Sequence, residues 1–233
     1  MNGNMIEFRT NGGTPSEGSA SGYLSLPPNG KRGPGLLVLQ EWWGLVGHIK
    51  DVADRFAAAG YVALAPDLYR GEQSTSPTEA QRLLMALDMA DTARMLRGGA
   101  EFLLSHDSVT PKRVGAVGFC MGGQLALFAA TAHPDVISAV VDFYGVFNPS
   151  VPVDISELRA PVQAHFGRTD KSVPPEKADG LIASIEATGV RCEAYQYEAG
   201  HAFFNDARPQ VYDEQSANLA WQRTLKFLGE TLT

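Results

Sequence analysis

Four short segments that follow apolar runs each carry one side chain capable of acid, base or nucleophilic chemistry. They are LQEWWG with Glu41, GFCMGG with Cys120, GRTDKSVP with Asp170 and EAGHAFFND with His201. Ligands of parallel sheets bind beyond the carboxyl ends of the strands, so segments of this kind converge on one site. A thiol, a carboxylate and an imidazole in this chain order predict a nucleophile, an orienting acid and a base.

The segment GFCMGG fits the pattern G-x-S-x-G of a sharp turn from a strand into a helix, with sulfur in place of oxygen. Gly118 and Gly122 remove Cβ atoms where the strand and the helix approach each other. The turn lifts Cys120 clear of the sheet and places it at a helix N-terminus, which favours a thiolate. The N–H group of Met121 then points to where a substrate oxyanion would form.

His201 is the predicted base, because a neutral imidazole can take the proton of Cys120 and return one to the leaving group. Asp170 is predicted to hold the other ring nitrogen. Aspartates in loops are commonly turn or cap residues, but GRTDKSVP directly follows a predicted strand, which favours Asp170. The competing aspartates are Asp142, Asp154 and Asp179.

The remaining reactive side chains have a structural interpretation. Cys192 alternates with Val190 and Ala194 in a predicted strand and is expected to be inert. No cluster of histidine, cysteine and carboxylate has the spacing of metal ligands, so no metal site is expected. The histidines expected to be structural or exposed are His48, His106, His133 and His165.

The four segments that carry the candidate residues connect strands and helices that alternate along the chain. Apolar runs predict strands at 35–40, 61–66, 113–119, 137–145, 161–167 and 191–198, after two N-terminal strands near 5–10 and 23–26. Amphipathic patterns predict helices at 48–60, 121–132, 174–189 and 212–230. The segment 76–106 is largely helical, with a break near Asp88–Asp91 or Gly98–Gly99. The alternation predicts one α/β domain, 1–233, with a mostly parallel sheet and helices on both faces.

Composition excludes several classes of protein. The 233 residues carry a formal charge of −7, which argues against nucleic acid as a partner. No apolar run is long enough to span a membrane, and the N-terminus lacks the pattern of a signal peptide, so a cytoplasmic location is expected. The two cysteines are too few for a disulfide framework. A monomer is the default expectation.

The chain resembles the dienelactone hydrolases of the α/β-hydrolase superfamily over nearly its full length. The segments that carry the resemblance are LQEWWGL, DVADRFAAAGYVALAPDLY, GFCMGG, YG, GRTDKSVP and GHAF, in this order. The resemblance implies an α/β-hydrolase fold, no cofactor, and a triad of Cys120, Asp170 and His201. It further implies that Glu41 pairs with the resting cysteine, and that Trp42 supplies the second N–H group of an oxyanion hole. A carboxylate beside the thiol would disfavour the thiolate until substrate displaces it; alternatively, Glu41 is a structural salt-bridge partner.

The chain departs from the family at the residues that hold the substrate. Family members that act on dienelactone use two arginines to bind its carboxylate, one at the start of the long helix and one four residues after the catalytic histidine. Here Arg82 is displaced from the first position, and the second holds Asn205, with Arg208 three residues later. Arg82 or Arg208 could substitute. Aromatic side chains expected at the pocket are Trp42, Trp43, Tyr144, Phe203 and Phe204.

The sequence therefore predicts a hydrolase that cleaves a small-molecule lactone or carboxylic ester through a thioester on Cys120. The displaced arginines leave open a carboxylesterase of broader specificity. A noncatalytic small-molecule or thiol-sensing protein on the same fold is the third interpretation, since a fold alone does not determine function.

Overall fold

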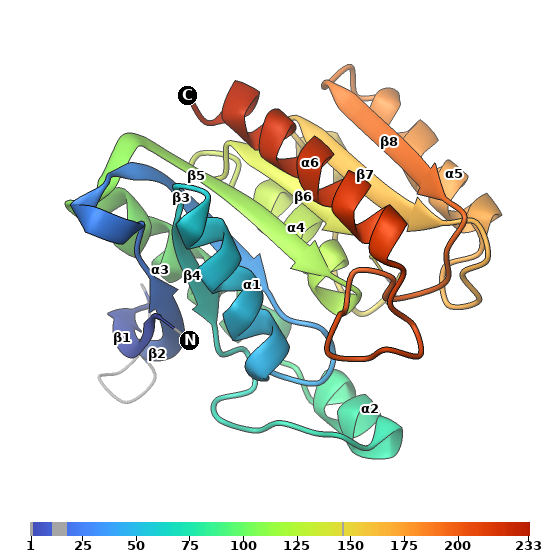
Figure 1. Cartoon of the computed structure of the whole chain (residues 1–233), viewed down its shortest axis with the longest axis horizontal. Coiled ribbons are helices and arrows are strands. Elements are labelled where there is room, and N and C mark those ends of the chain that lie inside the picture. The colour runs from blue at the N-terminus through green and yellow to red at the C-terminus, as the bar shows by residue number, and fades with distance from the viewer. Residues whose placement is uncertain (1, 11–17, 146) are drawn as a thin grey trace.

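A computed structural model describes residues 2–10, 18–145 and 147–233. These residues form an eight-stranded sheet in the order β1-β2-β4-β3-β5-β6-β7-β8, with helices on both faces (Figure 1). Strand β2 pairs antiparallel with β1 and β4, and every other neighbouring pair is parallel. The strands are β1 Asn4–Arg9, β2 Ser19–Ser25, β3 Gly33–Leu39, β4 Val62–Pro66, β5 Val109–Phe119, β6 Ala139–Phe143, β7 Val162–Gly167 and β8 Cys192–Tyr197.

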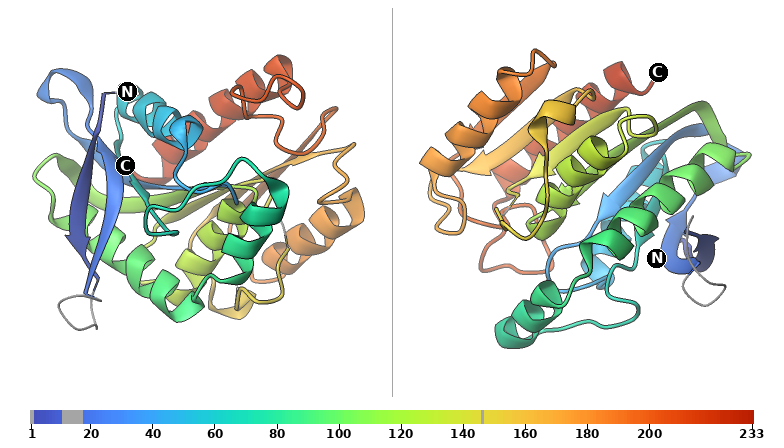
Figure 2. Two further views of the ribbon diagram at one scale, coloured as in Figure 1. Left: turned by 90° about the horizontal axis from the view of Figure 1, so that it is seen from below. Right: turned by 180° about the vertical axis from the view of Figure 1, so that it is seen from behind.

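Two layers of helices enclose the sheet, as Figure 2 shows from below and from behind. The helices are α1 Gly47–Ala58, α2 Pro77–Met85, α3 Met89–Ser105, α4 Met121–Ala132, α5 Pro175–Glu186 and α6 Glu214–Thr231, with short 3-10 helices η1 Pro28–Gly30 and η2 Ile155–Glu157. Helices α1 and α6 cover one face, and α3, α4 and α5 cover the other. In β3, Leu36 and Val38 pack with the α1 and α6 side, whereas Leu37 and Leu39 pack with the α3 and α4 side. Burial on both faces explains the unbroken apolar run of this strand.

The predicted α/β architecture with a mostly parallel sheet is confirmed, and the differences lie at element ends. Strand β2 begins at Ser19 and β5 at Val109, both earlier than the apolar runs indicate. The long helical segment is two helices, because Asp88 caps α3 by accepting hydrogen bonds from the N–H groups of Ala90 and Asp91. Gly98 does not break α3: a Cβ atom there would lie 2.3 Å from the carbonyl oxygen of Arg9, so glycine permits close packing on β1.

The carboxyl ends of the parallel strands lie along one edge of the sheet. Figure 1 shows α2 at this edge, near the loop that joins β8 to α6. The loops after β3, β5, β7 and β8 meet there, and they carry the four candidate side chains. None of the helices in the described ranges is both long and apolar enough to cross a bilayer.

Candidate active site

Cys120 occupies a strained turn between β5 and α4. Its backbone has φ 55° and ψ −118°, a conformation that non-glycine residues adopt only where the surroundings enforce it. A Cβ atom on Gly118 would lie 1.8 Å from the carbonyl oxygen of Gly122, and one on Gly122 would lie 2.4 Å from that of Leu39. The Cys120 N–H donates to the carbonyl oxygen of Phe143 at 3.0 Å, which ties the turn to β6. The glycines thus allow the tight turn that presents the thiol at the edge of the sheet.

His201 and Asp170 form the second part of the site. The Nδ1 atom of His201 lies 2.8 Å from Oδ2 of Asp170, whose side chain is fully buried. The other carboxylate oxygen of Asp170 accepts hydrogen bonds from the N–H groups of Ser172 at 2.7 Å and Val173 at 2.9 Å. Because a carboxylate only accepts, Nδ1 carries a proton. The loop after β7 therefore fixes the imidazole with its other nitrogen free for chemistry.

The pKa of His201 reflects this environment. Burial lowers the pKa, but the hydrogen bond to Asp170 and the neighbouring Cys120 outweigh it and raise the pKa to about 10. The surroundings of His201 therefore favour its protonated form, which a general base must adopt during the reaction. The ring of Tyr144 packs edge-on against it, with 5.2 Å between the ring centroids. The imidazole ring of His201 thus lies between the carboxylate of Asp170 and the sulfur of Cys120.

The two groups expected to form an oxyanion hole come from separate loops. Met121 is the first residue of α4, where N–H groups have no intrahelical partner. Trp42 follows Glu41 in the loop after β3. Both residues border the same pocket as Cys120. Tyr69 donates a hydrogen bond to the Met121 sulfur at 3.2 Å, which anchors this side chain.

Glu41 is buried behind the pocket and bonded to an amide. Its Oε2 accepts a hydrogen bond from Nδ2 of Asn205 at 2.7 Å, and its Oε1 has no partner among the described residues. Burial raises the pKa of Glu41, while the Asn205 hydrogen bond and the charges of His201 and Arg208 act against it. Asn205 thus occupies one of the two carboxylate oxygens, and the pairing of Glu41 with Cys120 that the resemblance implies stays a prediction. Asn205 stands four residues after His201, where the chain departs from the family's pattern, and no local spacing predicts its contact with Glu41.

A pocket of about 270 Å³ opens beside Cys120 and His201. Its wall is mainly apolar, as is usual for sites that bind small molecules. Gln124 lies one helical turn after Cys120, a spacing that could have identified it from the sequence. The residues that line the pocket are Trp42, Trp43, Pro77, Leu84, Cys120, Met121, Gln124, Asn148, Ser172, His201 and Arg208.

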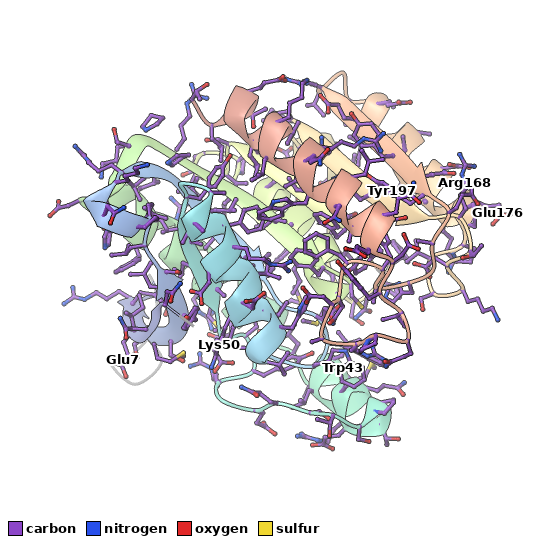
Figure 3. All side chains as sticks on the ribbon, in the orientation of Figure 1. Glu7, Trp43, Lys50, Arg168, Glu176 and Tyr197 are labelled. Atoms are coloured by element: carbon purple, nitrogen blue, oxygen red, sulfur yellow. The ribbon has the colours of Figure 1, made fainter. Side chains whose placement is uncertain are left out.

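One of the two candidate arginines reaches this pocket. The guanidinium of Arg208 lies over the ring of Trp43, 5.1 Å from its centroid, and Figure 3 shows Trp43 near α2. Arg82 is elsewhere: it hydrogen-bonds Glu79 at 2.8 Å and Glu72 at 2.6 Å on the exposed surface of α2. These two carboxylates hold the side chain away from the lining of this pocket, so its contacts do not support the expected role of Arg82 in substrate binding.

The five aromatic candidates divide between the pocket and the core. Trp42 and Trp43 line the pocket and contact each other edge-on, with ring centroids 5.0 Å apart. Tyr144, Phe203 and Phe204 are buried and lie outside the pocket lining. Phe204 stacks on Phe119 at 5.3 Å, and Phe203 packs against Tyr144 at the same centroid distance. Through these contacts Phe203 and Phe204 anchor the loop that carries His201 in the core.

The competing aspartates make other contacts. Asp142 accepts a hydrogen bond from the Gly145 N–H at 2.8 Å, Asp154 caps η2, and Asp179 accepts one from Gln196 at 2.8 Å. Asp170 is thus the aspartate that meets His201.

The other reactive side chains also have structural surroundings. Cys192 lies in β8, where burial raises the pKa of its thiol to about 11. His165 is buried within hydrogen-bond distance of Tyr197, Gln163 and Thr224, and burial lowers its pKa to about 3. Within the ranges that the structure describes, no group of three or more metal-ligating side chains is placed to hold an ion.

The sheet order and the turn at Cys120 place this protein among the α/β-hydrolases, as solved structures also indicate. The chain belongs to the dienelactone hydrolase family, whose model matches residues 20–232. It is 34% identical to "Protein usf" of Aquifex pyrophilus, over 99% of this chain and 100% of that protein. It is 31% identical to the "Putative carboxymethylenebutenolidase" of Aquifex aeolicus, over 97% of each chain. A crystal structure named "Putative Dienelactone Hydrolase", from Klebsiella pneumoniae, matches with a TM-score of 0.83 and 28% identity over 97% of this chain and 99% of that one.

Proposed function

We propose that the protein hydrolyses a small-molecule carboxylic ester or lactone through a covalent thioester on Cys120. The observation that carries the proposal is the contact series at the pocket, in which His201 lies between Asp170 and Cys120. The proposal also draws on the names of the relatives, which designate hydrolases of lactones.

In the proposed first half-reaction, the Cys120 thiol gives its proton to His201, the sulfur attacks the substrate carbonyl carbon, and the carbonyl electron pair moves onto oxygen. The N–H groups of Met121 and Trp42 hold this oxyanion. The C–O bond then breaks, and His201 gives its proton to the departing alkoxide. An ester releases an alcohol at this point, whereas the hydroxyl group of an opened lactone stays attached to the acyl group.

In the second half-reaction, a water molecule attacks the thioester carbonyl and gives its proton to His201. The thiolate leaves and takes this proton from His201, the acid is released, and the starting state is restored. Asp170 stabilises the imidazolium and keeps the ring in one orientation. Neither half-reaction requires a cofactor.

Two features favour a substrate range wider than dienelactone. Arg82 is paired with carboxylates on the surface, so Arg208 is the arginine that the pocket lining supplies. The wall around it is mainly apolar and aromatic, which suits uncharged aryl and alkyl esters. A carboxylesterase of broad specificity is therefore the second candidate function, through the same residues.

A pair of cysteine variants tests the chemistry. Cys120→Ala is expected to lower the hydrolysis of 4-nitrophenyl acetate and of dienelactone by at least about 10³-fold, because no acyl-enzyme can form. Cys192→Ala, the matched control, is expected to retain the wild-type rate. Wild-type turnover in Cys120→Ala would overturn the proposal. Stable binding of either ester to the wild-type protein with no turnover would favour the noncatalytic interpretation.

A further inference from the structure

A second cavity of about 420 Å³ lies on the far side of Gln124 from the reaction pocket. Its volume is in the range of about 300–1,000 Å³ that is typical of small-molecule sites. The cavity lies between α4, α5 and the segment that leads into η2. Most of its wall is apolar, and the apolar side chains of that wall include Leu127, Val153, Ile155, Val173, Ala178 and Leu181.

Asp142 is a buried carboxyl group in the wall of this cavity. Its Oδ1 accepts the hydrogen bond from Gly145, whereas its Oδ2 has no hydrogen-bond partner among the described residues. An unpaired buried oxygen destabilises the folded protein, and a ligand that supplies a hydrogen-bond donor can recover this lost free energy. Cβ atoms on Gly123 and Gly145 would lie only 2.1 Å and 2.5 Å from Oδ1. Glycine at these two positions therefore leaves the space that this carboxyl group occupies.

The two cavities share their dividing wall. The Gln124 side chain borders both, and it exchanges two hydrogen bonds with the backbone of Asn148, at 2.9 Å and 2.8 Å. Ser172 borders the reaction pocket and Val173 borders the second cavity, while the N–H groups of both donate to Asp170. A ligand in the second cavity would thus contact the loop that positions the candidate acid.

We propose that the second cavity binds a neutral, mainly apolar group that bears a hydroxyl, with the hydroxyl donating to Oδ2 of Asp142. A hydroxyl group suits this position because it can donate to a carboxylate and can also accept from a carboxylic acid. A protonated amine is less suitable, since Lys177 already places a cation in the cavity lining. The same chemistry is presented by a free alcohol and by the hydroxyl-bearing end of an ester.

Binding of benzyl alcohol and of toluene to the wild-type protein, titrated by NMR, tests the site without reference to catalysis. Benzyl alcohol is expected to bind saturably and about tenfold or more tightly than toluene, which corresponds to one hydrogen bond of about 1.4 kcal/mol. Leu181→Trp in α5 and Val153→Phe in the segment before η2, which each place a larger side chain in the cavity lining, are expected to abolish the binding. Ala183→Trp, an exposed position on the same helix, is the matched control and should bind as the wild type does. Equal affinity for the two probes, or unchanged binding in both filled variants, would overturn the proposal.

Kinetics separate the two sources of the hydroxyl group, and this comparison rests on the proposed function. If the hydroxyl belongs to the substrate, the 4-nitrophenyl ester of 8-hydroxyoctanoate should have a kcat/KM at least about fivefold higher than that of octanoate. Leu181→Trp should remove this preference, and Ala183→Trp should keep it. Saturable binding of benzyl alcohol with no kinetic preference would support the site and identify a free alcohol as its ligand. Failure of the proposed function would instead appear as Cys120-independent hydrolysis of 4-nitrophenyl acetate, and would leave the binding result intact.

Discussion

Asp142→Asn should gain stability relative to the wild-type protein as the pH rises. Burial raises the pKa of Asp142 in the folded protein from its ordinary value of 3.8 to about 7, against the weaker opposing effect of the Gly145 hydrogen bond. A carboxyl group with a raised folded pKa contributes stability that is fully present below pH 3.8 and is lost as the pH rises through about 7. Asparagine keeps the acceptor for Gly145 and cannot ionise.

The magnitude follows from the two pKa values. At about 1.36 kcal/mol for each pH unit between 3.8 and about 7, the full loss amounts to about 4 kcal/mol. About 2–3 kcal/mol of this loss falls between pH 5 and pH 8. The free energy of unfolding of Asp142→Asn, relative to the wild type, should therefore increase by about that amount between the two pH values.

Urea unfolding of the wild type and of Asp142→Asn at pH 5 and pH 8, followed by circular dichroism, measures how their difference in the free energy of unfolding changes with pH. Asp154→Asn is the control: hydrogen bonds from Ser156 lower the pKa of Asp154, so it is ionised at both pH values and its effect should not change between them. A stability difference between Asp142→Asn and the wild type that is the same at pH 5 and pH 8 would refute the assignment of a buried, weakly acidic carboxyl group.

Three further variants test the site. Asp170→Asn should lower kcat for 4-nitrophenyl acetate by about 10²–10⁴-fold with little change in KM, since the imidazolium loses its partner; an unchanged kcat would exclude Asp170 as the acid. Gly122→Ala should lower the free energy of unfolding by about 2 kcal/mol or more, because its Cβ would lie 2.4 Å from a carbonyl oxygen. The control Gly229→Ala, in open space on α6, should not destabilise the fold. Equal effects of the two variants in chemical denaturation would contradict the packing described for the turn. Arg208→Ala should raise KM about tenfold for an aryl ester that carries a carboxylate, and Arg82→Ala should change it less than about twofold; the reverse order in steady-state kinetics would place the anion site at α2.

The sequence was sufficient for the architecture and for the loops that converge, because both depend on local patterns. The apolar run of β3 reports burial on two faces, and the glycines around Cys120 report the close approach of strand and helix. Parallel strands place their carboxyl ends at one edge of the sheet, so the loops that follow these strands meet there. The meeting of His201 with Asp170 follows from that rule.

The contacts of long side chains could not be predicted from local sequence patterns. Arg82 lies on a helix that borders the pocket, but Glu72 and Glu79 hold it on the surface. The partner of Glu41 comes from a residue far away in the chain, Asn205, through a contact that no local spacing encodes. Phe203 is two residues after His201 in the chain, yet its ring packs into the core, because the loop after β8 turns this side chain inward.

The covalent intermediate is the most direct test of the proposed mechanism. Wild-type protein is mixed with 4-nitrophenyl acetate, quenched in acid within the first turnover, digested and analysed by mass spectrometry. The account predicts one acetyl group on the peptide that contains Cys120 and none on the peptide that contains Cys192. Continued turnover with no acetyl group on Cys120 at any quench time, or acetylation of Cys192 alone, would contradict it.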